Sequence, residues 1–172
     1  MAEAFLRHRL EGRKVDVRVG SAGLRFVGEP ASAHGVDVLA ERGVDLSGHR
    51  SRIVDRELLE GSDLVLAMSR EHLREAVLAL PEVWPRAFTL KELVRRGEVM
   101  GPRAPGESLE AWLARAHSGR NRLDLLGASP DDDVEDPIGL SRSDYEDTAD
   151  ELSNLVDRVV DLVWPAAAEE SA

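Results

Sequence analysis

The sequence predicts an α/β fold built on a parallel sheet, because strand-like segments alternate with helical ones along the chain. Val15–Val19 alternates apolar with charged residues, which is typical of a half-buried strand. Asp63–Met68 is a nearly continuous apolar run, as in strands that are covered on both faces. Arg86–Leu90 is expected to form a weaker third strand. Since sheets usually hold about 4–6 strands, the predicted sheet is one central strand short.

Apolar residues at helical spacing, together with start and stop signals, predict the helices. They are expected over 1–10, 32–42, a short stretch from 55, 69–80, a short stretch ending at 96, 107–116 and 145–164. The segments 97–106 and 121–143 are expected to be irregular, since the first is rich in Gly and Pro and the second is polar and acidic. One domain is predicted over residues 1–164, followed by a disordered tail at 165–172.

The composition excludes several functional classes. The 172 residues fit one domain and include no cysteine, which excludes disulfides, thiolate-bound zinc, iron–sulfur clusters and a thiol nucleophile from this sequence. There are 22 basic and 33 acidic residues, and an acidic chain without a basic patch argues against binding to nucleic acid. No apolar run suits a membrane span and no export signal is visible, so we expect a cytoplasmic location and no membrane partner.

Taken singly, the candidate functional residues have ordinary structural explanations. The five histidines never occur as H-x-x-x-H and no nucleotide-binding glycine motif is present, so neither a metal nor a cofactor is expected. The acidic cluster at 131–136 lacks the spacing of a calcium loop and is interpreted as a solvated loop. Ser21 fits a turn at a strand end, His49 a hydrogen-bonded loop position, and Asp136–Pro137 a turn.

Read in chain order, these segments resemble the low-molecular-weight protein-tyrosine phosphatases. In that family a strand and a phosphate loop of the form C-x-G-N-x-C-R-S-P precede a helix that begins M-A-E-A or similar. The segments that carry the resemblance are Met1–Phe5, Ser21–Leu24, Gly28–Pro30, Gly43–Arg52, Asp63–Met68, Asp136–Pro137 and Asp144–Glu146. The resemblance covers most of the chain apart from about 97–129, which we interpret as an insertion.

The resemblance implies a three-layer parallel sheet of the phosphotyrosine phosphatase I type, with the first central strand missing from this chain. It also implies hydrolysis of a phosphorylated protein or a small phosphomonoester through a cysteinyl-phosphate, with no cofactor. Asp136 corresponds to the general acid, which protonates the leaving oxygen. Ser21 and His49 correspond to residues that support the phosphate loop by hydrogen bonds to its Asn.

The chain departs from the family where the chemistry takes place. The nucleophilic Cys, the loop Asn and the Arg that clamps the phosphate would all lie before Met1, and no other cysteine is present. The family's aromatic pair after Asp-Pro, which helps to hold a tyrosyl ring, is replaced by Ile138–Gly139. The related arsenate reductases are excluded because their redox chemistry needs thiols.

Two hypotheses follow from these departures. In the first, this is a phosphatase whose reading frame begins too late, so the chain is inactive as given and the upstream DNA encodes the missing strand and loop. In the second, it is a non-catalytic binding or regulatory relative whose sheet is repaired by a partner or by a homodimer. The first predicts no turnover and poor solubility, whereas the second predicts a stable, monodisperse and inactive protein.

Overall fold

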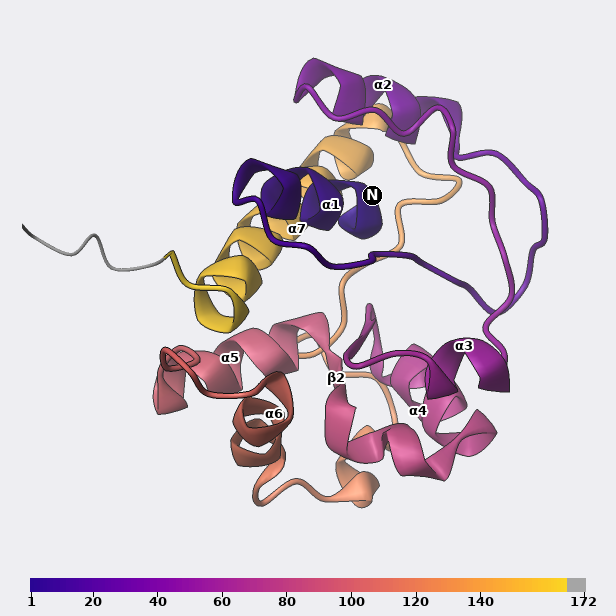
Figure 1. Ribbon diagram of the computed structural model, residues 1–172. Helices are drawn as coiled ribbons and strands as arrows, with labels where there is room; N and C mark the ends of the chain where they lie inside the picture. Colours follow the sequence, from indigo (N-terminus) through magenta and orange to yellow (C-terminus); the bar gives the residue numbers. More distant parts are fainter. Residues whose placement is uncertain (167–172) are drawn as a thin grey trace, which may run out of the picture.

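The structure is a computed structural model that describes residues 1–166 (Figure 1). The tail expected at 165–172 therefore lies outside the described residues from position 167 onward. Two of the elements, η1 and η2, are short 3-10 helices. In chain order the elements are α1 (Ala2–Gly12), α2 (Ala33–Glu41), α3 (Arg56–Glu60), β1 (Val65–Ala67), α4 (Arg70–Ala79), η1 (Pro81–Arg86), β2 (Ala87–Thr89), α5 (Leu90–Met100), α6 (Leu109–His117), η2 (Arg122–Leu125) and α7 (Arg142–Val163).

The two strands pair in parallel, which confirms the predicted α/β fold with a parallel sheet. β1 pairs with β2 so that Leu66 lies opposite Phe88, and no further strand joins this sheet within the described part of the chain. All three residues of β2 are buried, whereas Val65 and Leu66 of β1 are only partly buried. β1 therefore has an unpaired edge that the neighbouring elements cover incompletely.

The strand expected at Val15–Val19 does not form in the structure. The Val15 N–H donates instead to the Leu10 carbonyl at the end of α1 (3.1 Å). Contact with other extended backbone begins further along, where Gly23 forms a parallel bridge with Ile53. A strand needs an adjacent strand to satisfy its ladder of hydrogen bonds, so alternating valines without such a neighbour stay irregular.

Capping side chains determine where most of the helices begin. Five of them accept a hydrogen bond from the backbone N–H three residues later, and they are Ser32, Asp55, Ser69, Thr89 and Ser108. The prediction that a loop begins at residue 97 is wrong, because α5 continues to Met100. Gly97 packs there against Leu162 and Trp112, so a glycine that resembles a helix breaker in the sequence allows close helix packing. One short turn, η2, interrupts the irregular segment at 121–143.

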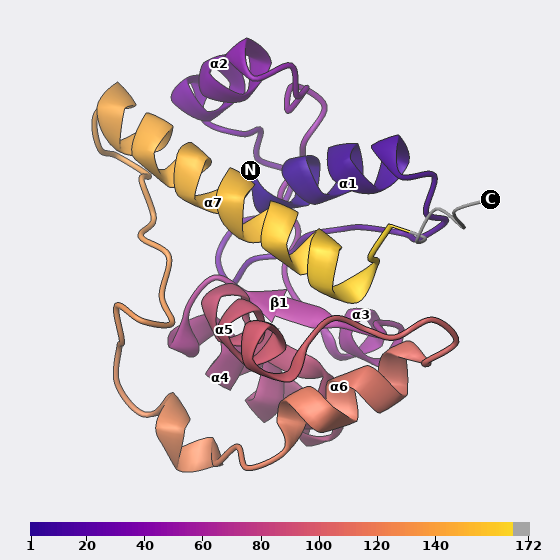
Figure 2. The same cartoon turned by 90° about the vertical axis from the view of Figure 1, so that its left-hand side faces the viewer.

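The larger core is organised around α7, which contacts α1, α2 and α5. Figure 2 shows α1 and α2 together with α7 on one side of the strands. The buried face of α7 includes Leu152, Val156 and Val159, which belong to the same apolar cluster as Phe5 of α1. A smaller core lies among α3, α4, η1 and the strands. None of the described helices has the length and apolar character that crossing a bilayer requires.

Charge in the molecule is paired across elements that lie far apart in the sequence. Residues 130–172 contain 14 acidic and two basic residues, so this end of the chain is strongly negative. Asp157 of α7 binds Arg9 of α1, and Asp150 of α7 binds Arg42 directly after α2, both at 2.5 Å. The acidic end is thus partly neutralised by arginines from the first quarter of the chain.

Candidate functional site

A charged cluster forms at the first turn of α1, where the Glu3 carboxylate meets three other side chains. Ser21 Oγ donates a hydrogen bond to Glu3 Oε2, and His49 Nδ1 lies 3.6 Å from the same oxygen. Arg7, one turn further along the helix, binds the other carboxylate oxygen. The Glu3 side chain is only 16% exposed, so these contacts are partly shielded from water. We call Glu3, Arg7, Ser21 and His49 the helix-start cluster.

The structure brings together the two residues that the sequence predicts as supports of a phosphate loop. Ser21 and His49 meet at one carboxylate, although they come from separate irregular segments. Glu3 is missing from the sequence-based prediction, because an acidic residue in a first helical turn is already explained by the helix dipole. Its contacts with Ser21 and His49 are visible only in the tertiary structure. The supporting role of both residues stays a prediction.

Ser21 is held in place by the segment that follows His49. Arg52 Nε donates to the Ser21 carbonyl (2.7 Å), and the Arg52 carbonyl accepts from the Gly23 N–H (2.8 Å). Gly20 lies directly against the Arg52 guanidinium, and a Cβ at this position would collide with it. A larger residue at position 20 would require the Arg52 guanidinium to move, and the hydrogen bonds of Arg52 fix the turn carrying Ser21 to the segment that also carries His49.

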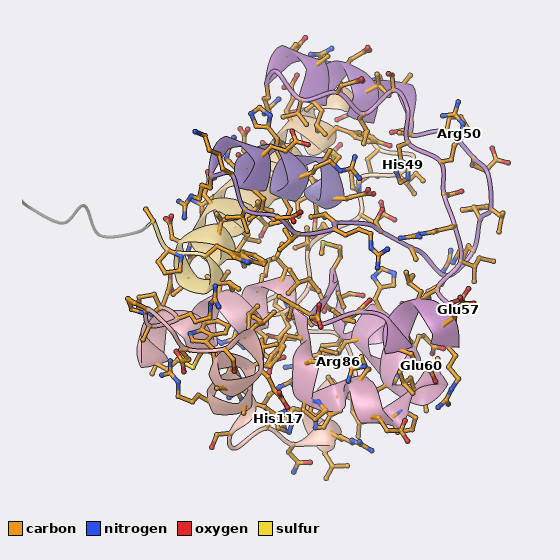
Figure 3. The ribbon with its side chains drawn as sticks, in the orientation of Figure 1. His49, Arg50, Glu57, Glu60, Arg86 and His117 are labelled. Atoms are coloured by element: carbon orange, nitrogen blue, oxygen red, sulfur yellow. The ribbon has the colours of Figure 1, made fainter. Side chains whose placement is uncertain are left out.

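His49 follows a tight turn that comes after α2. The His49 N–H donates to the Leu46 carbonyl (3.1 Å), and Asp45 Oδ1 accepts from the Ser47 N–H (2.8 Å). This backbone hydrogen bond from Ser47 lowers the pKa of Asp45 below its usual value. Figure 3 shows His49 beside the start of α1 and Arg50 further out. The turn therefore places His49 where its imidazole lies beside the Glu3 carboxylate.

Asp136 lies in the segment between η2 and α7, and it is exposed. Its Oδ1 accepts from the Ile138 N–H (3.1 Å), which forms a turn around the buried Pro137. Just before it, the Val134 N–H donates to the carbonyl of Met68, the residue directly after β1 (2.8 Å). Within residues 1–166 the structure records no hydrogen bond between Asp136 and the helix-start cluster. Its role as general acid stays a prediction.

The acidic cluster at 131–136 is not the fully solvated loop that the sequence predicts, because Asp132 is buried. Its carboxylate is 9% exposed and pairs with Arg70 and Arg95, each at 2.7 Å. Burial raises the pKa of Asp132, but hydrogen bonds from Arg95 and Arg70 outweigh burial and hold the pKa below its usual value. The sequence does not reveal this pairing, since both arginines come from a distant part of the chain.

The residue types present among the described residues limit the chemistry that is possible at this site. Across residues 1–166, no three His, Cys, Asp or Glu side chains gather as a metal site would require. The sequence contains no cysteine, so the thiolate that the resemblance implies is not among these residues. What the chain itself brings to the start of α1 is a hydroxyl and an imidazole that both lie against one carboxylate.

Comparison with known proteins identifies relatives over much of the chain. A family model described as low molecular weight phosphotyrosine protein phosphatase matches residues 1–108. The low molecular weight protein-tyrosine-phosphatase Etp of Escherichia coli K12 is 36% identical over 103 residues, which are 59% of this chain and 67% of Etp. The protein-arginine-phosphatase of Bacillus subtilis is 35% identical over 105 residues, which are 59% of this chain and 69% of that protein.

Solved structures extend the likeness beyond residue 108. The low molecular weight protein tyrosine phosphatase from T. tengcongensis has a TM-score of 0.69 and is 33% identical, covering 93% of this chain and 87% of its own. A mutant of YwlE from Bacillus subtilis has a TM-score of 0.66 and is 30% identical, covering 92% of this chain and 84% of its own. Because the family model matches more than half of the sequence and the fold agrees with these structures, the chain belongs to the low-molecular-weight protein-tyrosine phosphatase family.

Proposed function

We propose that this chain supplies the acid and the supporting residues of a phosphoprotein phosphatase whose thiolate loop lies directly before α1. In this proposal Ser21 and His49 support the phosphate loop and Asp136 protonates the leaving oxygen. The observation that carries the proposal is the convergence of Ser21 and His49 at the first turn of α1. In the family that this chain resembles, the phosphate loop is followed by the corresponding helix.

The proposed division of labour follows from the chemistry of phosphate-ester cleavage. A thiolate attacks phosphorus while the bond to the leaving oxygen breaks, and that oxygen gains negative charge. A carboxylic acid at Asp136 would transfer its proton to this oxygen, a contribution typically worth about 10²–10⁴-fold in rate. Backbone N–H groups at the start of a helix stabilise the phosphate oxygens. Since the sequence has no cysteine, we expect the polypeptide as printed to show no turnover.

The unpaired edge of β1 supports the same proposal. Leu66 and Met68 are half-buried and pack against the same core cluster as Val15, Val19 and Phe5. An extended strand placed between the two segments would pair with β1 and would give the alternating valines a neighbour. The phosphate loop could then follow that strand and end at the first turn of α1.

The substrate proposed is a phosphoprotein, and a cytoplasmic location is part of the proposal. The family supports a phosphorylated protein as substrate, and two of the relatives are named for phosphatases of tyrosine and of arginine. Ile138–Gly139 offers no aromatic ring after Asp136, so the chain lacks one of the contacts that favour a phenolic substrate. Peptides carrying phosphotyrosine and phosphoarginine should therefore be compared directly.

The proposal is tested by completing the chain. The strand and C-x5-R loop of Etp from Escherichia coli are fused in front of Met1, and hydrolysis of p-nitrophenyl phosphate is measured. We expect turnover by the fusion, and none by the unfused polypeptide or by a fusion whose loop Cys is changed to Ser. A fusion that folds and binds inorganic phosphate but hydrolyses no faster than its Cys→Ser control would contradict the proposal.

A non-catalytic homodimer is the second candidate, and the unpaired, partly buried edge of β1 is the observation that favours it. Two copies could cover their unpaired edges by pairing with one another. Sedimentation of the polypeptide as printed distinguishes the two candidates. A stable dimer that the fused strand converts to a monomer would locate the contact at β1, whereas a monomer at all concentrations would eliminate this candidate.

A further inference from the structure

Asp132 joins α4 and α5 to the irregular segment before α7 through one buried carboxylate. Arg70, at the first position of α4, donates from Nε to Asp132 Oδ2 at 2.7 Å. Arg95 of α5 donates from Nη2 to Asp132 Oδ1 at 2.7 Å, and from Nη1 to the Asp131 carbonyl at 2.9 Å. Hydrogen bonds in which both partners are charged are about twice as strong as neutral ones. We call Asp132, Arg70 and Arg95 the acid-loop latch.

Neighbouring contacts bind the same segment to the end of β1. The Asp133 carboxylate accepts from the Arg70 N–H (2.7 Å) and so caps the start of α4, where the helix dipole favours a negative charge. The Val134 N–H donates to the Met68 carbonyl, and Lys91 Nζ donates to the Asp133 carbonyl (2.7 Å). The segment 129–134 is thus fixed at the carboxyl end of β1, the edge where parallel α/β sheets bind their ligands.

We infer that Asp132 is a positioning residue for the general acid Asp136, an inference that rests on the proposed function. Asp136 is four residues beyond Asp132, a span of at most about 14 Å of extended chain. Its own side chain is exposed, and its one hydrogen bond recorded within residues 1–166 lies in the turn that contains it, so the anchor just before it limits where its carboxylate can reach. In this inference the latch affects catalysis only through the position of Asp136.

Amide hydrogen exchange tests the acid-loop latch in the unfused polypeptide. Asp132→Asn removes the charge while keeping nearly the same shape, and it leaves two guanidinium groups without their shared partner. We expect exchange at the Val134 amide to become about tenfold faster or more. The matched control is Asp131→Asn in the same loop, where the exposed side chain makes no hydrogen bond to the described residues, and we expect less than a twofold change. Equal exchange in the two variants would overturn the inference.

A second variant keeps the test decisive if Asp132→Asn fails to fold. Arg95 is half-exposed, with 53% of its side chain accessible, so Arg95→Gln removes one arm of the latch with less disturbance to the core. We expect a severalfold faster exchange at the Val134 amide, with Arg158→Gln on the neighbouring helix as the control. No difference between these two variants would also overturn the inference.

Catalysis by the completed fusion tests the link to Asp136. Acid catalysis matters more for a poor leaving group, so Asp132→Asn should lower kcat more for phenyl phosphate than for p-nitrophenyl phosphate, and Asp132→Glu should restore part of the loss. Equal losses for both substrates would mean that Asp132 serves the fold alone, and this would overturn the positioning role. An inactive fusion without any further substitution would count against the proposed function instead, because hydrogen exchange reports the latch independently.

Discussion

At the scale of single residues, Arg120 carries a charge that is almost completely buried. Its side chain is 1% exposed, and its guanidinium carbon lies 3.7 Å from the ring centroid of Trp84 and 4.0 Å from that of Phe88. Glu92 accepts two hydrogen bonds from it, at 2.7 and 2.8 Å. Burial lowers the pKa of Arg120, but an arginine stays protonated in proteins and here keeps its acidic partner. Arg120 lies in the connection between α6 and η2, whereas Phe88 belongs to β2 and Glu92 to α5. These contacts therefore hold that connection against β2 and α5.

Replacing Arg120 tests how much this buried pair contributes. Arg120→Met leaves the Glu92 carboxylate, which is 13% exposed, with Arg96 as its remaining partner. We expect the free energy of unfolding in urea to fall by about 3 kcal/mol. The control is Arg122→Met, which removes one exposed hydrogen bond to the Pro81 carbonyl and should cost less than about 0.5 kcal/mol. A cost below about 1 kcal/mol for Arg120→Met would contradict this account.

The helix-start cluster makes a separate prediction at the same scale. Glu3→Gln weakens contacts with Ser21, His49 and Arg7 at once. We expect a loss of about 1–2 kcal/mol in thermal unfolding, since hydrogen bonds to charged groups contribute more than neutral ones. Glu11→Gln on the same helix is the control, because that side chain is exposed and forms no ion pair with the described residues. Equal stability of the two variants would mean that the cluster contributes nothing to the fold.

At the scale of elements, α5 shows how packing overrides local sequence preference. The stretch that contains Gly97 has the composition of a loop, yet the helix continues through it to Met100. The indole of Trp112 and the end of Leu162 lie against the bare backbone of Gly97. A glycine inside a helix costs roughly 1 kcal/mol relative to alanine, and close contact with two buried side chains offsets that cost here.

Gly97→Ala should therefore destabilise the protein, although alanine is the better helix former. The added Cβ would lie 2.7 Å from Leu162 Cδ1 and 3.3 Å from Trp112 Cζ2, and both of these side chains are buried. Overpacking costs typically 1–3 kcal/mol, so we expect a net loss of about 1 kcal/mol in chemical unfolding. Gly12→Ala, with no atom within 4 Å of the new Cβ, should be neutral or slightly stabilising. The reverse order would contradict close packing at Gly97.

At the scale of the whole molecule, carboxyl groups whose pKa is lowered in the folded chain make stability depend on pH. The pKa of Asp132 is lowered in the folded chain, and hydrogen bonds from Arg115 and Ser141 lower those of Glu107 and Asp144 respectively. A lowered folded pKa gives stability that is complete above the unfolded value, about 3.9 for Asp, and that is lost as the pH falls through the folded value. Of the three groups only Asp132 is well shielded from water, so it should dominate.

We therefore expect the Tm to fall steeply below about pH 4, and to fall less steeply in Asp132→Asn. Calorimetry from pH 7 to pH 2.5 would compare the unsubstituted chain with this variant and with Asp131→Asn. The control should follow the unsubstituted chain, because Asp131 is exposed. Parallel curves for the unsubstituted chain and Asp132→Asn would mean that the acid-loop latch contributes nothing to acid stability.

Prediction from sequence succeeded where the signal is local. The helices expected from 55 and from 69 begin directly after the capping residues Asp55 and Ser69, and the apolar run at 63–68 forms β1 in its middle. It was wrong where the outcome depends on a neighbour. Val15–Val19 has the pattern of a strand but lacks an adjacent one, and Asp132 belongs to a polar run but is buried between two arginines.

The sequence by itself determined the family, the α/β class with its parallel pairing, and the absence of a thiol from the printed residues, because these follow from residue order and composition. Only the tertiary structure decided that Ser21 and His49 meet at Glu3, and that the segment before Asp136 is latched to α4 and α5. The physical reason is that the position of a charged residue in the sequence does not reveal which residue it will pair with. Its burial and its hydrogen bonds are fixed only when distant segments pack against one another.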